Sequence, residues 1–229
     1  VHFTLFGIPV YIRPSFWVVL AIFGGALSIS SVEDLIYPAL FVIAGFVAIL
    51  SHEMGHALVG RKLGGGQQTI VLELFGGLTS SHGMQLTRGG RALMILAGPM
   101  MTLLLGIISL WLTWNIVAPV MTSYNLNFWD LAISPFTAAL ISPKLYILSC
   151  LIMIGEWWTI LNLLPIYPLD GGQLIAQYIR SPRKVFMTGF ITAILIGLLS
   201  FQLFHGYFIP IFMALFAYSN YREYKNAPF

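Results

Sequence analysis

Long apolar runs, separated by short polar or glycine-rich segments, dominate the hydrophobic pattern of the chain. Such a run predicts a membrane-spanning helix, because about 20 consecutive apolar residues are needed to cross the hydrocarbon core of a bilayer. We therefore predict a bundle of six transmembrane helices. The spans are expected at about 15–29, 36–60, 89–117, 145–164, 185–204 and 207–221, with the third interrupted by Gly98-Pro99.

Two stretches follow a different pattern. Residues 67–82 are β-prone up to Gly76-Gly77, which predicts a hairpin or edge strand that dips toward the membrane. Residues 1–14 alternate loosely around Gly7 and Pro9, which predicts a short extended segment or small hairpin. The predicted fold class is an all-α membrane protein, a six-transmembrane-helix bundle with a small membrane-associated β-hairpin or sheet. We find no repeat or soluble appendage and expect a single transmembrane domain over residues 1–229.

Composition strengthens the membrane assignment. Hydrophobic residues make up 58% of the chain and charged residues 8%, against roughly 25% charged residues in soluble domains. The net charge of +3 is too small to indicate nucleic acid as a partner. The lone Cys150 excludes an intrachain disulfide. Val1–Pro14 lacks the basic and apolar regions of a cleavable signal sequence, so we expect none.

The distribution of positive charge predicts the orientation in the membrane. Six spans place both termini on one side, and ten of the eleven Lys and Arg residues then fall on that side, with Lys144 as the exception. Positive residues favour the cytoplasmic side, so both termini are expected in the cytoplasm of a multi-pass cell-membrane protein. His56 precedes Arg61 by about 8 Å of helix. Chemistry at His56 would therefore lie within the bilayer, near its cytoplasmic face.

A polar motif, His52-Glu53-Met54-Gly55-His56, interrupts the second span. Two His residues four apart project from one face of a helix, where both imidazoles can bind one Zn²⁺. Glu53 would stand beside the metal as a general base. Polar groups are costly at this depth, which calls for a functional explanation.

A catalytic zinc usually takes three protein ligands and leaves one position open. Asp170 is the favoured third ligand, because it lies in a Gly- and Pro-shaped segment at the cytoplasmic end of the fourth span. The other candidates are Glu156, Glu73, His82 and Cys150. Asn162 can donate a hydrogen bond to substrate backbone or to an oxyanion, or it can satisfy backbone loosened by Pro165. Gly98 is expected to serve close helix packing.

The sequence resembles the site-2 protease family of intramembrane zinc metalloproteases. The resemblance rests on His52-Glu53-x-x-His56, on Asn162-x-x-Pro165-x-x-x-x-Asp170-Gly171 and on Gly98-Pro99 between them. It implies one Zn²⁺ per chain held by His52, His56 and Asp170, with Glu53 as catalytic base and Asn162 as a substrate-positioning or oxyanion group. Thr102 departs from the Asn that often stands three residues after the Pro. No PDZ or CBS domain is expected.

The resemblance also implies that a hairpin near Gly76-Gly77 pairs with an unwound substrate. β-Addition is a common way to hold an extended peptide. The predicted substrate-binding residues are Leu72, Leu74, Gly76 and Gly77.

The function predicted from these features is an intramembrane zinc metalloprotease. It would cut transmembrane segments of membrane-protein substrates near their cytoplasmic ends, as in regulated intramembrane proteolysis. The alternative is a metal-binding membrane transporter or channel, because buried His, Asp and Glu also build ion paths. Transporters usually spread such groups over the midplane and often contain internal repeats, neither of which is visible here.

Overall fold

The computed structural model describes residues 1–74, 76–83, 85–124, 129, 132 and 134–228. The chain is mostly helical and divides into two compact units, Val1–Thr159 and Ile160–Phe229.

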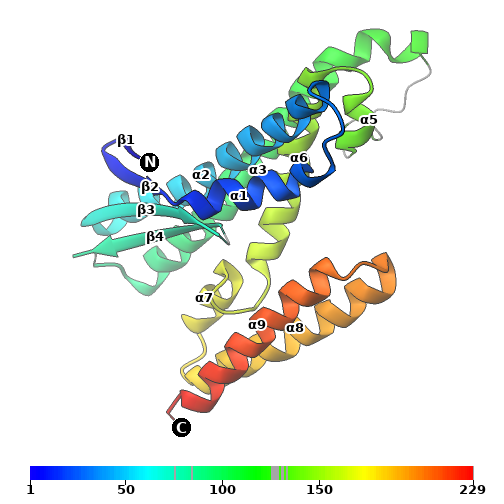
Figure 1. Ribbon diagram of the computed structural model, residues 1–229. Coiled ribbons are helices and arrows are strands. Elements are labelled where there is room, and N and C mark those ends of the chain that lie inside the picture. Colours follow the sequence, from blue (N-terminus) through cyan, green and yellow to red (C-terminus); the bar gives the residue numbers. More distant parts are fainter. Residues whose placement is uncertain (75, 84, 125–128, 130–131, 133, 229) are drawn as a thin grey trace. The chain divides into compact units, whose positions relative to one another are not determined.

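A four-stranded sheet belongs to the first unit (Figure 1). Its strands are β1 (His2–Leu5), β2 (Ile8–Ile12), β3 (Gln67–Glu73) and β4 (Gly76–His82). The β1–β2 and β3–β4 pairs are antiparallel hairpins, which confirms both extended segments predicted from the sequence. Strands β2 and β3 pair in parallel and join the two hairpins in the order β1-β2-β3-β4, so that β4 is an edge strand.

The helices of the first unit connect the two hairpins or follow β4 along the chain. They are α1 (Pro14–Phe23), α2 (Ile36–Gly64), α3 (Arg88–Tyr124), α5 (Pro135–Ala139) and α6 (Pro143–Leu163) up to Thr159, with 3₁₀ turns η1 (Ala26–Ser28) and η2 (Glu33–Leu35). Helix α3 is continuous across Gly98-Pro99, so the predicted interruption is wrong. Proline removes one backbone donor, and the neighbouring hydrogen bonds keep such a transmembrane helix intact.

The main core of the first unit lies between the sheet and α2. Alternate residues of β2 and β3 point to the same face, where they are buried against apolar residues of α1 and α2. The buried members are Ile8, Val10, Ile12, Phe16, Leu20, Ile49, Leu50, Met54, Ala57, Ile70 and Leu72. This packing fixes the sheet against the part of α2 that contains the His-Glu-x-x-His motif.

Glycines set the helix spacing around the same region. A Cβ on Gly55 of α2 would lie 2.8 Å from the carbonyl carbon of Ala97 in α3. A Cβ on Gly155 of α6 would lie 3.3 Å from the Cα atom of Gly106 in α3. Small residues allow helix backbones to approach closely inside a membrane. The α2–α3 and α3–α6 contacts are therefore close backbone contacts.

The second unit contains the end of α6, a turn, α7 (Asp170–Ala176), α8 (Pro182–Phe204) and α9 (Phe208–Asn226). Helices α8 and α9 lie side by side (Figure 1). Ile166 of the turn is buried with Ala193 of α8 and with Met213 and Ala217 of α9. The turn that leads to Asp170 is therefore packed on the α8–α9 pair.

Four helices of the described residues are long and apolar enough to cross a membrane, at 33–64, 88–118, 143–163 and 182–203. They match the second to fifth predicted spans. Helix α1 has only 10 residues, about 15 Å of helix at 1.5 Å per residue, and a bilayer core is about 30 Å thick. The count of six is therefore not confirmed, but the chain is a multi-pass membrane protein.

Candidate metal centre

The two histidines of the motif lie one turn apart on α2, with their rings nearly perpendicular and the ring centroids 4.8 Å apart. Their Nε2 atoms are 3.1 Å apart, and the side chains of His52 and His56 are 2% and 8% exposed. The Nδ1 atom of His56 lies 2.8 Å from the carbonyl oxygen of Met94 in α3. A carbonyl can only accept a hydrogen bond, so Nδ1 donates and the Nε2 atom of a neutral imidazole keeps its lone pair.

Gly98 of α3 leaves the space into which these nitrogens project. A Cβ at this position would contact the Nε2 atom of His56 and would lie 2.9 Å from the Nε2 atom of His52. The predicted packing role of Gly98 is therefore incomplete, because the absence of a side chain also leaves room for the Nε2 atoms of both imidazoles.

Glu53 lies between the two histidines in sequence and is 5% exposed. Thr79 of β4 donates a hydrogen bond of 2.7 Å to its Oε2 atom. The general-base candidate is thus held by the edge strand of the sheet.

Asp170 begins α7 and is 6% exposed. The two glycines that follow it pack directly on the preceding turn. A Cβ on Gly171 would lie 2.5 Å from the carbonyl carbon of Leu163, and one on Gly172 would lie 2.5 Å from the carbonyl oxygen of Ile166. The Asp-Gly-Gly sequence therefore lets α7 start against the turn and places the carboxylate at the helix N-terminus.

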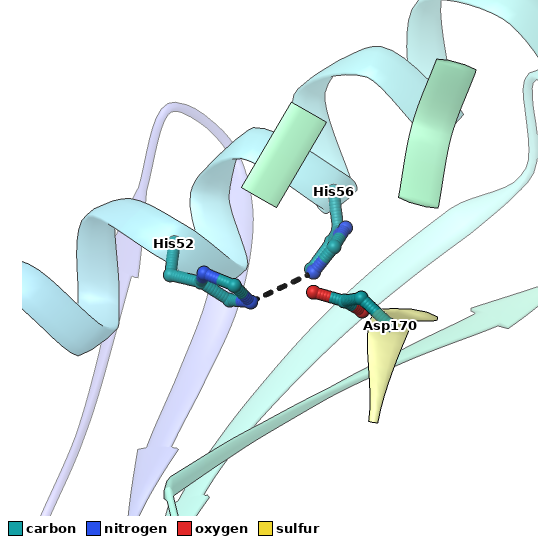
Figure 2. Close-up of side chains that lie close together, drawn as sticks. All are labelled: His52, His56 and Asp170. Carbon is teal, nitrogen blue, oxygen red and sulfur yellow. Dashed lines mark hydrogen bonds between the residues drawn. The ribbon is translucent and has the colours of Figure 1, made fainter. Parts of the chain in front are cut away.

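The ligand atoms of His52, His56 and Asp170 all lie within 4.8 Å of one another (Figure 2). Among the described residues, this is the one group of three or more His, Cys, Asp or Glu side chains that could hold a metal ion. The four other candidates for the third ligand lie elsewhere. Glu73 pairs with Arg13 at 2.8 Å, Cys150 is buried against Ala44 and Tyr146, and Glu156 and His82 are exposed.

These residues fit a zinc ion. Two nitrogen ligands about 2.0–2.1 Å from a tetrahedral zinc are about 3.3 Å apart, close to the observed 3.1 Å between the two Nε2 atoms. Two imidazoles and one carboxylate form a set of three protein ligands that leaves the fourth position for water or substrate. Because Gly98 has no side chain, no Cβ occupies the space beside the two Nε2 atoms.

The other predicted site residues lie on three different elements. Asn162 is 8% exposed near the end of α6, eight residues before Asp170. Gly76 and Gly77 are on the edge strand β4, and Leu74 is 42% exposed between β3 and β4. Leu72 is on the inner strand β3 with 0% exposure and packs in the core, so its side chain does not face a substrate.

Sequence reasoning missed the positions that support the motif. Thr79 and the carbonyl of Met94 carry no local signal, since each is an ordinary residue of a strand or helix. Thr102, at the position where relatives often have Asn, is buried and contacts the hydroxyl of Thr159 in α6 at 2.9 Å and the carbonyl oxygen of Pro99 at 3.0 Å. It therefore links α3 to α6 beside Gly98.

Comparison with known proteins places these features in a family. The model of peptidase family M50 matches residues 40–204, which include the His-Glu-x-x-His motif and Asp170. The solved site-2 protease from Methanocaldococcus jannaschii has a similar fold, with a TM-score of 0.61 at 24% identity. The match covers 98% of this chain and 94% of that chain.

Several curated relatives are named as zinc metalloproteases. The chain is 29% identical over 227 residues to zinc metalloprotease MJ0392 of Methanocaldococcus jannaschii, covering 94% of this chain and 57% of the relative. It is 28% identical over 188 residues to the putative zinc metalloprotease sll0528 of Synechocystis, covering 77% and 43%. The chain thus spans about half the length of these relatives. The resemblance to site-2 proteases is confirmed, and the chain belongs to peptidase family M50.

Proposed function

We propose that this protein is an intramembrane zinc endopeptidase that hydrolyses peptide bonds in or near transmembrane segments of other membrane proteins. The observation that carries the proposal is that the ligand atoms of His52 and His56 on α2 and of Asp170 on α7 lie within 4.8 Å of one another. The motif on α2 also contains the buried Glu53. Family membership supports the same reaction.

In this proposal the His52 and His56 Nε2 atoms and the Asp170 carboxylate hold one zinc ion. Zinc supplies Lewis-acid activation of water and of the scissile carbonyl. Glu53 accepts the proton of the attacking water and later donates it to the leaving amine nitrogen. Asn162 donates a side-chain amide hydrogen bond to the substrate backbone or to the developing oxyanion.

The substrate is held as an extended strand along β4. A helix must unwind before a protease can reach its peptide bonds, and an open sheet edge offers the backbone groups that such a segment needs. Support comes from the position of β4 at the edge of the sheet and from its contact with Glu53. Gly76 and Gly77 on this strand and Leu74 in the turn before it are the contact candidates, whereas the burial of Leu72 favours a packing role.

We also propose that residues 1–229 act as one transmembrane protease domain with six spans, in which residues 15–29, which include most of α1 and all of η1, supply the first span and α9 supplies the last. Both termini then face the cytoplasm, and the zinc lies near the cytoplasmic face of a cell membrane. The bias of Lys and Arg, ten of eleven on one side, supports this orientation. Partners are the lipid bilayer and a transmembrane protein or peptide substrate.

Glu53→Gln is the direct test. Full-length protein would be reconstituted in liposomes with a panel of single-span peptides, each about 25 residues long, with Gly, Asn or Pro near the cytoplasmic end. The variant should lose cleavage by at least about 10²-fold and keep near one zinc per chain. Glu156→Gln, which changes an exposed Glu in α6, serves as the matched control and should retain activity. Cleavage by Glu53→Gln at the wild-type rate would refute the proposal.

A metal-binding transporter or channel is the alternative. It predicts zinc flux into liposomes that does not depend on Glu53, together with no cleavage of any peptide in the panel. Zinc uptake is measured with an entrapped fluorescent indicator in the same preparations. Proteolysis without flux supports the protease.

A further inference from the structure

The edge strand β4 differs from β3 in the residues that it turns toward α2. On β3 this face carries Ile70 and Leu72, which are fully buried in the core. Their partners in register on β4 are Thr79 and Gly77. The large apolar residues on this face therefore stop at β4. There the hydroxyl of Thr79 and the backbone of Gly77, which has no side chain, face Glu53.

Both β4 residues contact the Glu53 side chain. The Thr79 hydroxyl lies 2.7 Å from the Oε2 atom of Glu53 and 3.2 Å from its backbone oxygen. A Cβ on Gly77 would lie 2.6 Å from the Oε1 atom of Glu53 and in contact with its Cγ atom. The strand thus passes directly along the carboxylate, with Thr79 bound to one oxygen and the backbone at Gly77 beside the other.

This geometry has a consequence for a general base. A carboxylate on a free side chain samples several rotamers, and only some of them direct an oxygen toward the attacking water. A hydrogen bond to an ionised group is stronger than one between neutral groups. Since Glu53 is 5% exposed, a bond from Thr79 to Oε2 holds the side chain in one direction and leaves Oε1 for the proton transfer.

We propose that Thr79 is a positioning residue for Glu53. Its hydroxyl orients the carboxylate, and because it lies on β4 it ties this orientation to the strand along which the substrate pairs. The inference rests on the proposed protease function and adds a residue outside the His-Glu-x-x-His and Asn-to-Asp motifs. A purely structural role would instead have the hydroxyl serve only to satisfy a buried carboxylate during folding.

Three variants of Thr79 separate these roles. Thr79→Val keeps the shape and removes the hydroxyl, Thr79→Ser keeps the hydroxyl, and Thr79→Ala removes both. The matched control is Ser81→Ala, because Ser81 lies on the same face of β4 but donates its hydrogen bond to Gln68. Each full-length variant is assayed with the peptide panel for kcat and KM, for zinc content and for the thermal unfolding midpoint.

We expect Thr79→Val to lower kcat by about 10- to 100-fold, with KM within about twofold of wild type and zinc content unchanged. Thr79→Ser should restore kcat to within about threefold of wild type, and Ser81→Ala should leave kcat unchanged. If Thr79→Val fails to fold, the comparison of Thr79→Ala with Thr79→Ser decides, since only the second retains the donor.

Two results would overturn the inference. One is a Thr79→Val or Thr79→Ala protein that keeps the wild-type kcat. The other is an equal loss of kcat in Thr79→Ser and Thr79→Ala, which would assign the effect to shape rather than to the hydroxyl. Wild type and Glu53→Gln are run alongside. Cleavage by wild type that is lost in Glu53→Gln upholds the protease function even when the Thr79 variants behave as wild type, whereas an inactive wild type removes both proposals.

Discussion

The side-chain amide of Asn220 in α9 donates a hydrogen bond of 2.6 Å to the carbonyl oxygen of Tyr167. Asn220 is 1% exposed. It fits there because Gly189 of α8 has no side chain: a Cβ on Gly189 would lie only 2.8 Å from the Cγ atom of Asn220. Tyr167 is three residues before Asp170. A buried polar side chain in the last helix therefore fixes the turn that leads to the third candidate ligand.

Replacing Asn220 should weaken this turn. Asn220→Ala removes the donor to the Tyr167 carbonyl oxygen, a loss of about 0.5–1.5 kcal/mol for an ordinary hydrogen bond. We expect a lower thermal unfolding midpoint in detergent and a zinc Kd raised by up to about tenfold, measured by competition with a chelating dye. Asn115→Ala is the control, because Asn115 is exposed and its side-chain amide donates a hydrogen bond of 2.7 Å to the carbonyl oxygen of Trp111 in its own helix. Equal behaviour of the two variants would contradict this role.

A methyl group at position 98 should disturb the metal centre. The Cβ of Gly98→Ala would contact the imidazole nitrogens of His56 and His52. Because the backbone of α3 cannot withdraw without breaking its contact with Gly55, we expect zinc content well below one per chain and loss of cleavage. At Gly106 the new Cβ would lie 3.9 Å from the carbonyl oxygen of Ile152, the nearest atom of a neighbouring element among the described residues. Gly106→Ala should therefore bind zinc as wild type does, and a Gly98→Ala protein with full zinc content would count against the site.

Removal of a ligand should act on metal content rather than on folding alone. His52→Ala, His56→Ala and Asp170→Ala should each lower the zinc content measured by mass spectrometry after dialysis, because a zinc held by two protein ligands exchanges more readily. Chelation of wild type should abolish cleavage, and added Zn²⁺ should restore it. Glu73→Ala, which removes another candidate ligand, should change neither the zinc content nor the rate of cleavage. If Asp170→Ala kept its zinc, Asp170 would not be the third ligand, and one of the other candidates would have to be.

The proposed orientation can be tested with single cysteines. Cys150 is the only cysteine and is buried, so a Cys150→Ser background gives no labelling of its own. In sealed vesicles, Val1→Cys and Lys225→Cys should react with a membrane-impermeant maleimide from the cytoplasmic side. Ser30→Cys, in the turn after α1, should react from the opposite side. All three positions are exposed. Labelling of Val1→Cys and Ser30→Cys from one side would contradict a spanning α1.

Much of the site could be predicted because its determinants are local. The four-residue spacing of His52 and His56 places both rings on one face of any helix. The Gly and Pro residues around Asp170 predict that the preceding helix ends before it. Long apolar runs likewise predict spans from their length. Local pattern could not determine the extent of α1, where apolar composition continues to Ile29 but Gly24-Gly25 end the helix at Phe23.

By itself, the sequence therefore determined the membrane class, the four long spans, both extended segments and the group of candidate ligands. Only the tertiary structure decided the parallel β2–β3 pairing that joins two hairpins about 60 residues apart, the burial of Leu72, the place of Gly98 beside the imidazoles and the bond from Thr79 to Glu53. The physical reason is that spacing and propensity act over a few neighbouring residues. Contacts between distant segments instead depend on which surfaces pack together, and one chain's local pattern allows several such packings.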